Sequence, residues 1–251
     1  MVETMKSEDE VLLVEDAGAV RILFMNRPAR LNALNSALTR ALHDALLAAK
    51  EAQSVRAIVI AAKGRAFCAG ADLTEFAELR PEHREAVTER SFLTSRTHML
   101  LQEIEKPIVS AVQGAAAGGG AGLAIGCDMM VAASDLKLMY PELRHSIVPA
   151  IVMTSLQRQL GRKVAFEVFS LGKTLDATEA LALGLANRVV APGEQVRAAC
   201  EIAEAWASAN PAAMAAAKRL FYRVADLSFD AAMEEGRKVN EAMRAFPEPR
   251  K

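Results

Sequence analysis

Up to about Val190, apolar positions follow two different periods, which predicts strands alternating with helices. Residues 11–15 and 19–25 are apolar-rich and are expected to form a hairpin, with Asp16-Ala17-Gly18 as its turn. Apolar residues from 37 to 52 recur at helical spacing, and Ser36 is the expected N-cap. Further strands are expected at residues 57–62, 108–112, 129–132, 137–139 and 186–190, and further helices at 72–79, at 81–104 and from about Gly119.

Beyond Pro149 the pattern is helical almost throughout. Asp176 with Glu179 forms an expected capping box, and Asn210-Pro211 supplies a cap and an N1 proline for a later helix. Because alternating elements come first and helices alone follow, the order predicts an α/β layered domain with a helical C-terminal region. The boundary is expected near Pro192-Gly193, which gives a core domain of residues 1–192 and a helical region of residues 193–251.

One uncharged stretch has the length of a membrane span. The 21 positions between Lys106 and Asp128 lack a charged side chain, and glycines recur in it at every fourth position, as they do between packed membrane helices. The stretch is mostly alanine and glycine, which contribute little transfer energy, and it also contains Pro107 and Gln113. We therefore expect a buried strand, a glycine loop and a helix, and no membrane partner.

Composition narrows the class of protein. The 251 residues are 52% hydrophobic and have a net charge of -1, which excludes intrinsic disorder and gives no basic excess for nucleic-acid binding. Cys68, Cys127 and Cys200 are far apart, as expected for reduced thiols in a cytoplasmic protein. Residues 1–10 are acidic and lack an apolar segment, so no secretory signal is expected.

Two glycine loops are the candidate catalytic site. They contain neither a dinucleotide fingerprint nor a P-loop, and the histidines are scattered, so we expect no metal and no separate cofactor. Each loop joins a buried strand to a helix, and the first N–H groups of a helix have no intrahelical partner. Two such amides aimed at one oxygen form an oxyanion hole, in which each donor can contribute about 2.7–4 kcal/mol. Alternatively, the glycines only allow close packing.

Four ordered segments together carry a family resemblance. They are Asn26-Arg27-Pro28 with Leu31-Asn32-Ala33-Leu34, then Ala66-Phe67-Cys68-Ala69-Gly70-Ala71-Asp72-Leu73, then Gln113-Gly114 through Gly118-Gly119-Gly120 to Cys127-Asp128, and lastly residues 177–190. The chain resembles the enoyl-CoA hydratase/isomerase (crotonase) family over essentially its whole length. The resemblance implies an α/β spiral of ββα units with a C-terminal helical trimerisation region. It also implies a homotrimer or a dimer of trimers that binds acyl-CoA thioesters.

The resemblance assigns roles to individual residues. The oxyanion-hole amides fall on Ala71 and Gly119. CoA, which enters as part of the substrate, would lie along a loop with five candidate residues: Lys63, Arg65, Ala69, Asp72 and Leu73. For Lys63 and Arg65, a solvated charged loop is the alternative.

The catalytic carboxylates depart from the family pattern. A family hydratase has two glutamates, and their positions in this chain are Gly122 and Glu142. Adding water to a double bond needs a base and an acid, each typically contributing roughly 10²–10⁴-fold, whereas moving a double bond needs one carboxylate. The single Glu142 therefore favours isomerisation. An apolar approach to Glu142 predicts burial and a raised pKa. The alternative is a solvated glutamate paired with Arg144, and His145 could be a second acid–base group or a structural histidine.

Further departures affect the pocket and the C-terminus. After Pro149 the turn reads Ala150 and then bulkier residues at 151–153, where family hydratases have glycines, so a reshaped pocket containing Gly122 and Ala150 is expected. Only residues 247–251 stand where the family has a longer tail over CoA. Three apolar residues are expected either in an acyl tunnel or in the core: Phe76, Phe92 and Met99.

Three functional hypotheses remain. The first is an enzyme of the enoyl-CoA hydratase/isomerase type that hydrates a 2-enoyl-CoA or isomerises a 3-enoyl-CoA through a stabilised enolate. The second is an acyl-CoA hydrolase or decarboxylase, which the same oxyanion hole would serve. The third is a catalytically silent CoA-binding paralogue.

Overall fold

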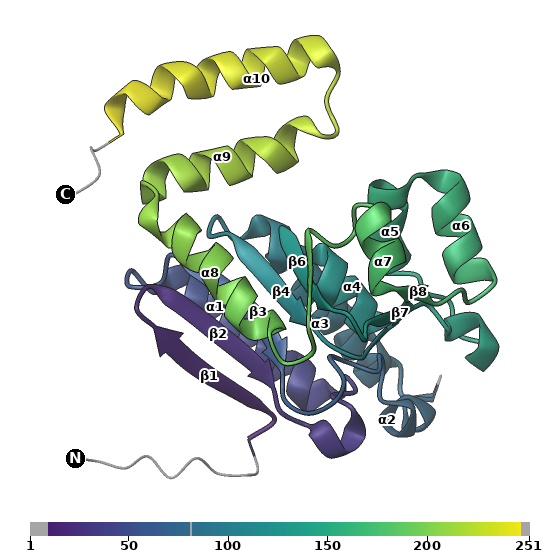
Figure 1. Ribbon diagram of the computed structural model, residues 1–251. Helices are drawn as coiled ribbons and strands as arrows, with labels where there is room; N and C mark the ends of the chain where they lie inside the picture. The colour runs from purple at the N-terminus through teal and green to yellow at the C-terminus, as the bar shows by residue number, and fades with distance from the viewer. Residues whose placement is uncertain (1–9, 81, 247–251) are drawn as a thin grey trace, which may run out of the picture.

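The computed structural model describes residues 10–80 and 82–246, whose strands form two sheets (Figure 1). The strands are β1 (Leu12–Ala17), β2 (Val20–Met25), β3 (Ala57–Ala62), β4 (Ile108–Val112), β5 (Ala115–Ala117), β6 (Met129–Ala133), β7 (Lys137–Met139), β8 (Leu175–Asp176) and β9 (Arg188–Val190). The larger sheet has the order β1-β2-β3-β4-β6-β9 and is parallel except for β1, while the smaller has the order β5-β7-β8.

Helices surround the sheets and continue beyond them. They are α1 (Ser36–Glu51), α2 (Leu73–Glu78), α3 (Arg84–Glu103), α4 (Gly119–Gly126), α5 (Met153–Leu160), α6 (Arg162–Ser170), α7 (Ala177–Ala182), α8 (Gln195–Ser208), α9 (Pro211–Val224) and α10 (Phe229–Ala242). Short 3₁₀ helices are η1 (Pro28–Arg30), η2 (Glu142–His145) and η3 (Met243–Ala245). The predicted α/β architecture with C-terminal helices is confirmed.

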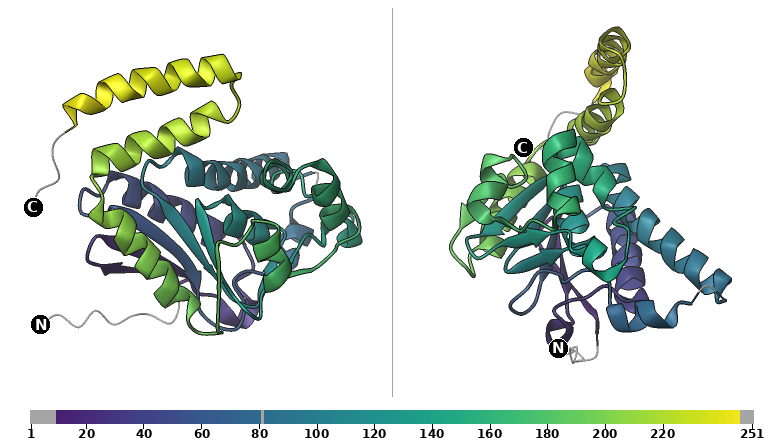
Figure 2. Two further views of the ribbon diagram at one scale, coloured as in Figure 1. Left: turned by 45° about the horizontal axis from the view of Figure 1, so that its top comes forward. Right: turned by 90° about the vertical axis from the view of Figure 1, so that its right-hand side faces the viewer.

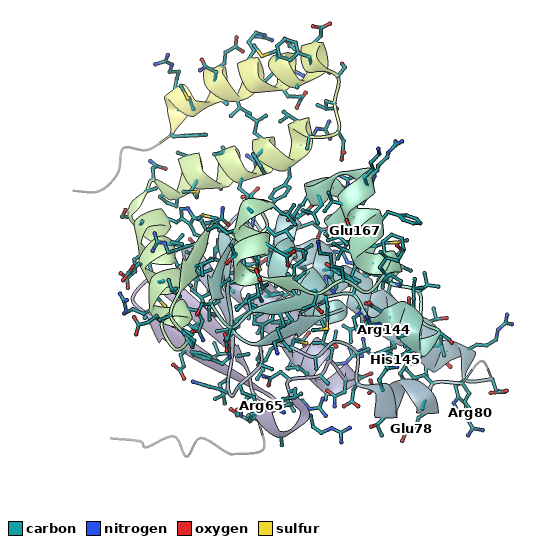
Figure 3. All side chains as sticks on the ribbon, turned by 45° about the vertical axis from the view of Figure 1, so that its right-hand side comes forward. Arg65, Glu78, Arg80, Arg144, His145 and Glu167 are labelled. Atoms are coloured by element: carbon teal, nitrogen blue, oxygen red, sulfur yellow. The ribbon has the colours of Figure 1, made fainter. Side chains whose placement is uncertain are left out.

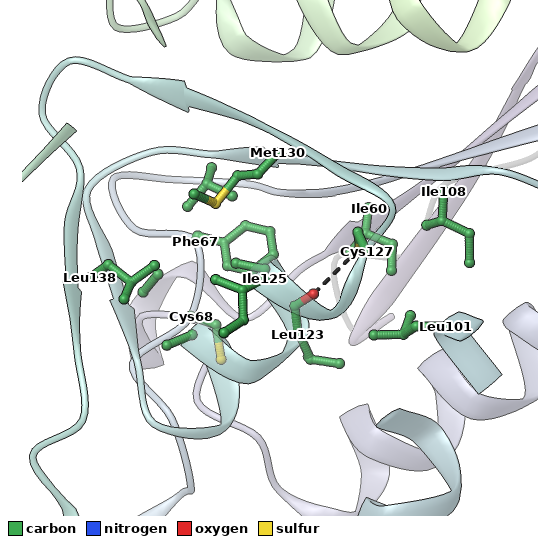
Figure 4. Close-up of a cluster of buried hydrophobic side chains, with 14 of the residues drawn as sticks. Ile60, Phe67, Cys68, Leu101, Ile108, Leu123, Ile125, Cys127, Met130 and Leu138 are labelled. Carbon is green, nitrogen blue, oxygen red and sulfur yellow. Dashed lines mark hydrogen bonds between the residues drawn. The ribbon is translucent and has the colours of Figure 1, made fainter. Parts of the chain in front are cut away.

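The central strands β3 and β4 of the larger sheet are buried on both faces, which explains the continuous apolar run of β3. In β3, alternate residues face opposite layers: Val59 packs in the cluster under α8, and Ile58 and Ile60 pack in the cluster with α1, α3 and α4. Figure 4 shows part of the second cluster, where the thiol of Cys127 donates to the carbonyl oxygen of Leu123 at 3.3 Å.

The local predictions differ from the structure at a few places. The side chain of Asn35, rather than the expected Ser36, caps α1 by accepting from the Leu38 amide at 2.9 Å. The expected glycine loop contains β5, and β8 was not expected. Their short lengths gave no periodic signal, because pairing with β7 across the chain defines both strands. The capping box at Asp176 and the cap at Asn210 are confirmed.

The uncharged stretch after Lys106 folds into β4, β5 and α4. Among the described residues, no helix has both the length and the hydrophobicity needed to cross a bilayer.

The C-terminal helices fall into two groups (Figure 2). α8 lies against the larger sheet through Ala198, Ala199 and Ile202. α9 and α10 form an antiparallel pair that projects from the body, and no residue of α10 is buried. The expected boundary between residues 192 and 193 stays a prediction, as does a trimerisation role for the region after it.

A buried lysine anchors α9 to the body. Lys218 Nζ donates to Asp128 Oδ2 at 2.7 Å and to the carbonyl oxygens of Leu101 at 2.9 Å and Lys106 at 3.0 Å. Tyr222 donates its hydroxyl to Asp128 Oδ1 at 2.7 Å. Burial lowers the pKa of Lys218, although Asp128 opposes this change. All three donors of the ammonium group are therefore satisfied inside the protein.

We expect Lys218→Met to lower the free energy of unfolding by about 3–5 kcal/mol, because it removes the cationic partner of the largely buried Asp128 carboxyl group. The matched control is Arg219→Met, since Arg219 pairs with Glu105 at the surface and should change stability by less than about 1 kcal/mol. Urea unfolding of the two variants tests this. Equal losses would contradict an anchoring role for Lys218.

Candidate active site

The loop after β3 and the start of α4 meet at Leu34. The backbone of Leu34 forms a parallel bridge with Ala71, and a methyl group placed on Gly119 would lie 3.0 Å from its Cδ1 atom. A methyl group on Gly70 would lie 3.8 Å from the amide nitrogen of Gly119 and 2.9 Å from the carbonyl oxygen of Ala117. The backbone at 70–71 therefore lies beside the backbone at 117–119.

The amide of Ala71 is unpaired because its neighbours on both sides take the bonds to Leu34. The Leu34 amide donates to the carbonyl oxygen of Gly70 at 2.7 Å, and the Asp72 amide donates to the carbonyl oxygen of Leu34 at 3.0 Å. Within the described ranges, the Ala71 N–H donates no hydrogen bond. It is thus free to bind an oxygen atom of a ligand.

The amide of Gly119 is unpaired because it begins a helix. The preceding amide, of Gly118, donates to the carbonyl oxygen of Met139 at 2.9 Å, and Gly118 as N-cap has no side chain to cap α4. In the part of the chain that the structure describes, the Gly119 N–H has no acceptor. The positive end of the α4 dipole adds to the attraction of this amide for negative charge.

Glu142 lies directly against this helix start. A methyl group on Gly118 would come within 2.5 Å of Glu142 Oε1, so the carboxyl group packs on the N-cap of α4. Oε2 is buried and has no hydrogen-bond partner among the described residues. Burial raises the pKa of Glu142, and its own backbone amide opposes the rise only in part. Such a carboxyl group can take a proton from a ligand and return it.

Two neighbours of Glu142 had alternative interpretations. Arg144 donates to the carbonyl oxygen of Gly172 at 3.1 Å, and no ion pair between Arg144 and Glu142 occurs among the described residues. His145 is exposed (Figure 3), and its electrostatic interaction with Glu142 opposes the rise in the pKa of that carboxyl group, so a role for His145 as a second acid–base group stays a prediction.

The first family-like segment turns out to be scaffolding for the loop after β3. Asn32, buried and with a φ of 54°, donates from Nδ2 to the carbonyl oxygens of Lys63 and Ala66 at 2.9 Å. Gln113 donates from Nε2 to the carbonyl oxygens of Ala62 and Gly64 at 2.9 and 3.0 Å. No local sequence pattern identifies these two roles, because both depend on contacts with residues distant in the chain.

Asp72 is held by two arginines. Its carboxylate pairs with Arg27 at 3.0 Å and Arg30 at 3.2 Å and accepts from the Thr74 amide at the start of α2. Burial alone would raise the pKa of Asp72, but the hydrogen bonds from Arg27 and Arg30 outweigh it and hold the pKa below its ordinary value. Asp72 thus fixes the residue next to the Ala71 amide, and its expected contact with CoA stays a prediction.

The other candidate residues for CoA line the same loop. Lys63 Nζ lies 3.5 Å from the centre of the Phe24 ring and 3.6 Å from Glu15 Oε1, whereas Arg65 is exposed (Figure 3). Ala69 is half-buried and Leu73 is 49% exposed. Gly122 is buried in α4, and Ala150 is exposed beyond it.

Three apolar residues that could have been core residues are exposed in the structure. Phe76, Phe92 and Met99 are 48%, 65% and 50% exposed, so they are not core residues, and a role in an acyl tunnel stays a prediction.

No group of three or more metal-ligating side chains occurs among the described residues. A cavity of about 520 Å³ lies at the C-terminal ends of α1 and α3, and its lining includes neither Glu142 nor Gly119.

Gly118→Ala should destabilise the protein and displace the Glu142 carboxyl group. Residue 118 has a φ of 49°, and the added methyl group would meet Oε1. Gly18→Ala is the control for strain alone, because Gly18 has a φ of 60° and no atom near its methyl position, and it should cost about 1–2 kcal/mol. Urea unfolding of both variants is the measurement. A loss for Gly118→Ala no larger than the control's would contradict the packing of Glu142 on α4.

Glu142→Gln should stabilise the protein in a pH-dependent way. Because burial raises the pKa of Glu142 above 4.5, the folded protein keeps this proton to a higher pH than the unfolded chain does. Between the two pKa values the unfolded chain binds fewer protons, so this group's contribution to stability falls as pH rises. The variant should melt above wild type at about pH 8, and the difference should shrink toward about pH 4. A difference independent of pH would argue against a buried charge.

Comparisons with known proteins identify the family of this chain. Residues 15–246 match the model of the enoyl-CoA hydratase/isomerase family. A short-chain-enoyl-CoA hydratase of Clostridium acetobutylicum is 32% identical, covering 88% of this chain and 85% of that protein. A crotonyl-CoA hydratase of Syntrophomonas wolfei is 34% identical, covering 74% of this chain and 71% of that protein. The crystal structure of an enoyl-CoA hydratase from Mycobacterium smegmatis has a TM-score of 0.88 and 33% identity, covering 94% and 92% of the two chains. These likenesses confirm the expected fold, and the chain belongs to the enoyl-CoA hydratase/isomerase family.

Proposed function

We propose that this protein moves the double bond of a 3-enoyl-CoA thioester to the 2-position through an enolate. The observation that supports this most is the single carboxyl group of Glu142, packed on the N-cap of α4 beside the unpaired Gly119 amide. The family membership supports a CoA thioester as the substrate.

The amides of Ala71 and Gly119 would bind the thioester oxygen. Removing a proton from C2 places negative charge on this oxygen, and two backbone donors stabilise it where it develops. Because Leu34 and Gly70 fix the two backbones next to each other, the donors need no reorganisation during the reaction.

Glu142 would be the base and then the acid. Its carboxylate takes the proton from C2, and the C2–H electron pair enters the conjugated enolate. The carboxylic acid then returns the proton to C4, so that the double bond between C3 and C4 becomes one between C2 and C3. No water is consumed, and one group with a raised pKa suffices for both transfers.

The remaining roles follow from the resemblance. We assign CoA binding to the loop residues Lys63, Arg65, Ala69, Asp72 and Leu73, and we assign the walls of the acyl pocket to Gly122 and Ala150. No cofactor is needed beyond the CoA of the substrate. A homotrimer or dimer of trimers would cover the apolar side chains of α9 and α10, among which Phe221 and Phe229 are 70% and 78% exposed. The expected effect of the short tail falls on residues 247–251, outside the described residues.

Hydration of a 2-enoyl-CoA is the second candidate function. The names of the relatives from Clostridium acetobutylicum and Syntrophomonas wolfei favour it. The absence of a carboxylate at Gly122 disfavours it.

Ultraviolet absorbance of the conjugated thioester separates the candidates. A 3-enoyl-CoA should gain absorbance with the wild-type protein, and Glu142→Gln should lower this rate by roughly 10²–10⁴-fold. Glu167→Gln, at an exposed position of α6 (labelled in Figure 3), is the matched control and should keep the wild-type rate.

Other outcomes would favour the alternatives. Loss of absorbance from a 2-enoyl-CoA would indicate hydration, and release of free thiol would indicate hydrolysis. No reaction with any substrate would favour the silent paralogue. A Glu142→Gln rate within a few-fold of wild type would remove Glu142 as the base.

A further inference from the structure

The space beside Gly122 is already filled. A methyl group placed on Gly122 would lie 2.7 Å from Val152 Cγ1, 2.9 Å from Val152 Cβ and 3.0 Å from His98 Cε1. Val152 comes from the N-cap of α5 and His98 from α3, so two separate elements meet at this point of α4. Gly122 therefore has no room for a side chain of any size.

Val152 cannot easily move aside. Its side chain is β-branched, only 6% exposed and part of the main core cluster. The amide of the next residue, Met153, donates to the carbonyl oxygen of Pro149 at 2.9 Å, which fixes the backbone of this turn. A close-packed interior does not absorb an added methyl group without strain.

His98 contributes volume without charge. Its Cε1 atom, which lies between the two ring nitrogens, points at the methyl position of Gly122. Burial lowers the pKa of His98 to about 4, so the ring is neutral at physiological pH. The wall opposite Gly122 thus consists of an aliphatic group and a neutral ring.

Gly122 stands one helical turn from the Glu142 carboxyl group. The Gly122 amide donates to the carbonyl oxygen of Gly118 at 2.9 Å, and Gly118 is the residue on which Glu142 packs. A carboxylate at residue 122 would share the pocket with Glu142, which is the arrangement that adding water requires. The side chains of Val152 and His98 already occupy this space, so they exclude such a carboxylate.

We propose that Val152 and His98 are specificity-determining residues that occupy the place of a second carboxylate and thereby restrict the site to proton transfer by Glu142. This inference rests on the proposed function. It also explains why Gly122→Glu alone should not give hydration, since the new side chain would have to displace Val152.

Melting temperatures test the packing without using activity. Gly122→Ala should lower the melting temperature by several degrees, whereas Gly236→Ala, a helical glycine in α10 with no atom near its methyl position, should leave it equal or higher. Val152→Gly removes the two close atoms that belong to Val152. In the Val152→Gly background, Gly122→Ala should therefore lower the melting temperature by at most half as much as it does in wild type. His98→Ala should also lower the cost of Gly122→Ala, but by less, because only one of the three close atoms belongs to His98. Equal costs of Gly122→Ala in all three backgrounds would overturn the proposal.

Measurements of hydration activity test whether Val152 and His98 determine the reaction specificity. The double variant Gly122→Glu with Val152→Gly should hydrate a 2-enoyl-CoA at least tenfold faster than either single variant. Hydration by Gly122→Glu alone at the rate of the double variant would overturn the proposal, and so would a stable double variant without any gain.

The proposed function and the specificity role of Val152 and His98 can fail independently. If wild type isomerises a 3-enoyl-CoA but the melting temperatures show no coupling, the specificity role is wrong and the proposed function stands. If coupling is present but wild type performs no isomerisation, the proposed function and the selectivity both fall, and only the packing of residue 122 stands.

Discussion

Close contact between backbone segments, at positions where glycine leaves no side chain between them, is the constraint on which this structure depends. Residues 118–122 approach the loop at 68–70, the Glu142 carboxyl group and Val152 so closely that a single methyl group would collide at Gly118, Gly120 or Gly122. Glycine there is required by space, and at Gly118 also by a φ of 49°. The first amide of α4 has no acceptor among the described residues, because Gly118 has no side chain to cap it.

The rest of the molecule keeps these segments in place. Two strands that are buried on both faces end at the site, and Asn32, Gln113 and Asp72 tie the intervening loop to its neighbours with side-chain hydrogen bonds. The unfavourable burial of the Glu142 carboxyl group is tolerated because hydrophobic burial elsewhere is far larger. The role that we propose for Glu142 therefore opposes stability at this one residue, whereas the hydrogen bonds around the loop favour both.

The sequence predicted the parts of this arrangement that have a local cause. The strands at 57–62 and 108–112 matched because their apolar runs are long, and the caps at Asp176 and Asn210 matched because capping is local. The roles that the family resemblance assigns to Ala71, Gly119 and Glu142 stay predictions. The sequence did not predict β5, the exposure of Phe92 or the contacts of Gly122, since each depends on residues that meet only after folding.

The fit between Gly122 and Val152 makes the two positions interdependent. Two residues 30 positions apart occupy one volume, so a larger group at one requires a smaller group at the other. The side chains that the fold accepts at residue 122 are therefore decided at residue 152, and a substitution at either position has to be judged together with the residue at the other.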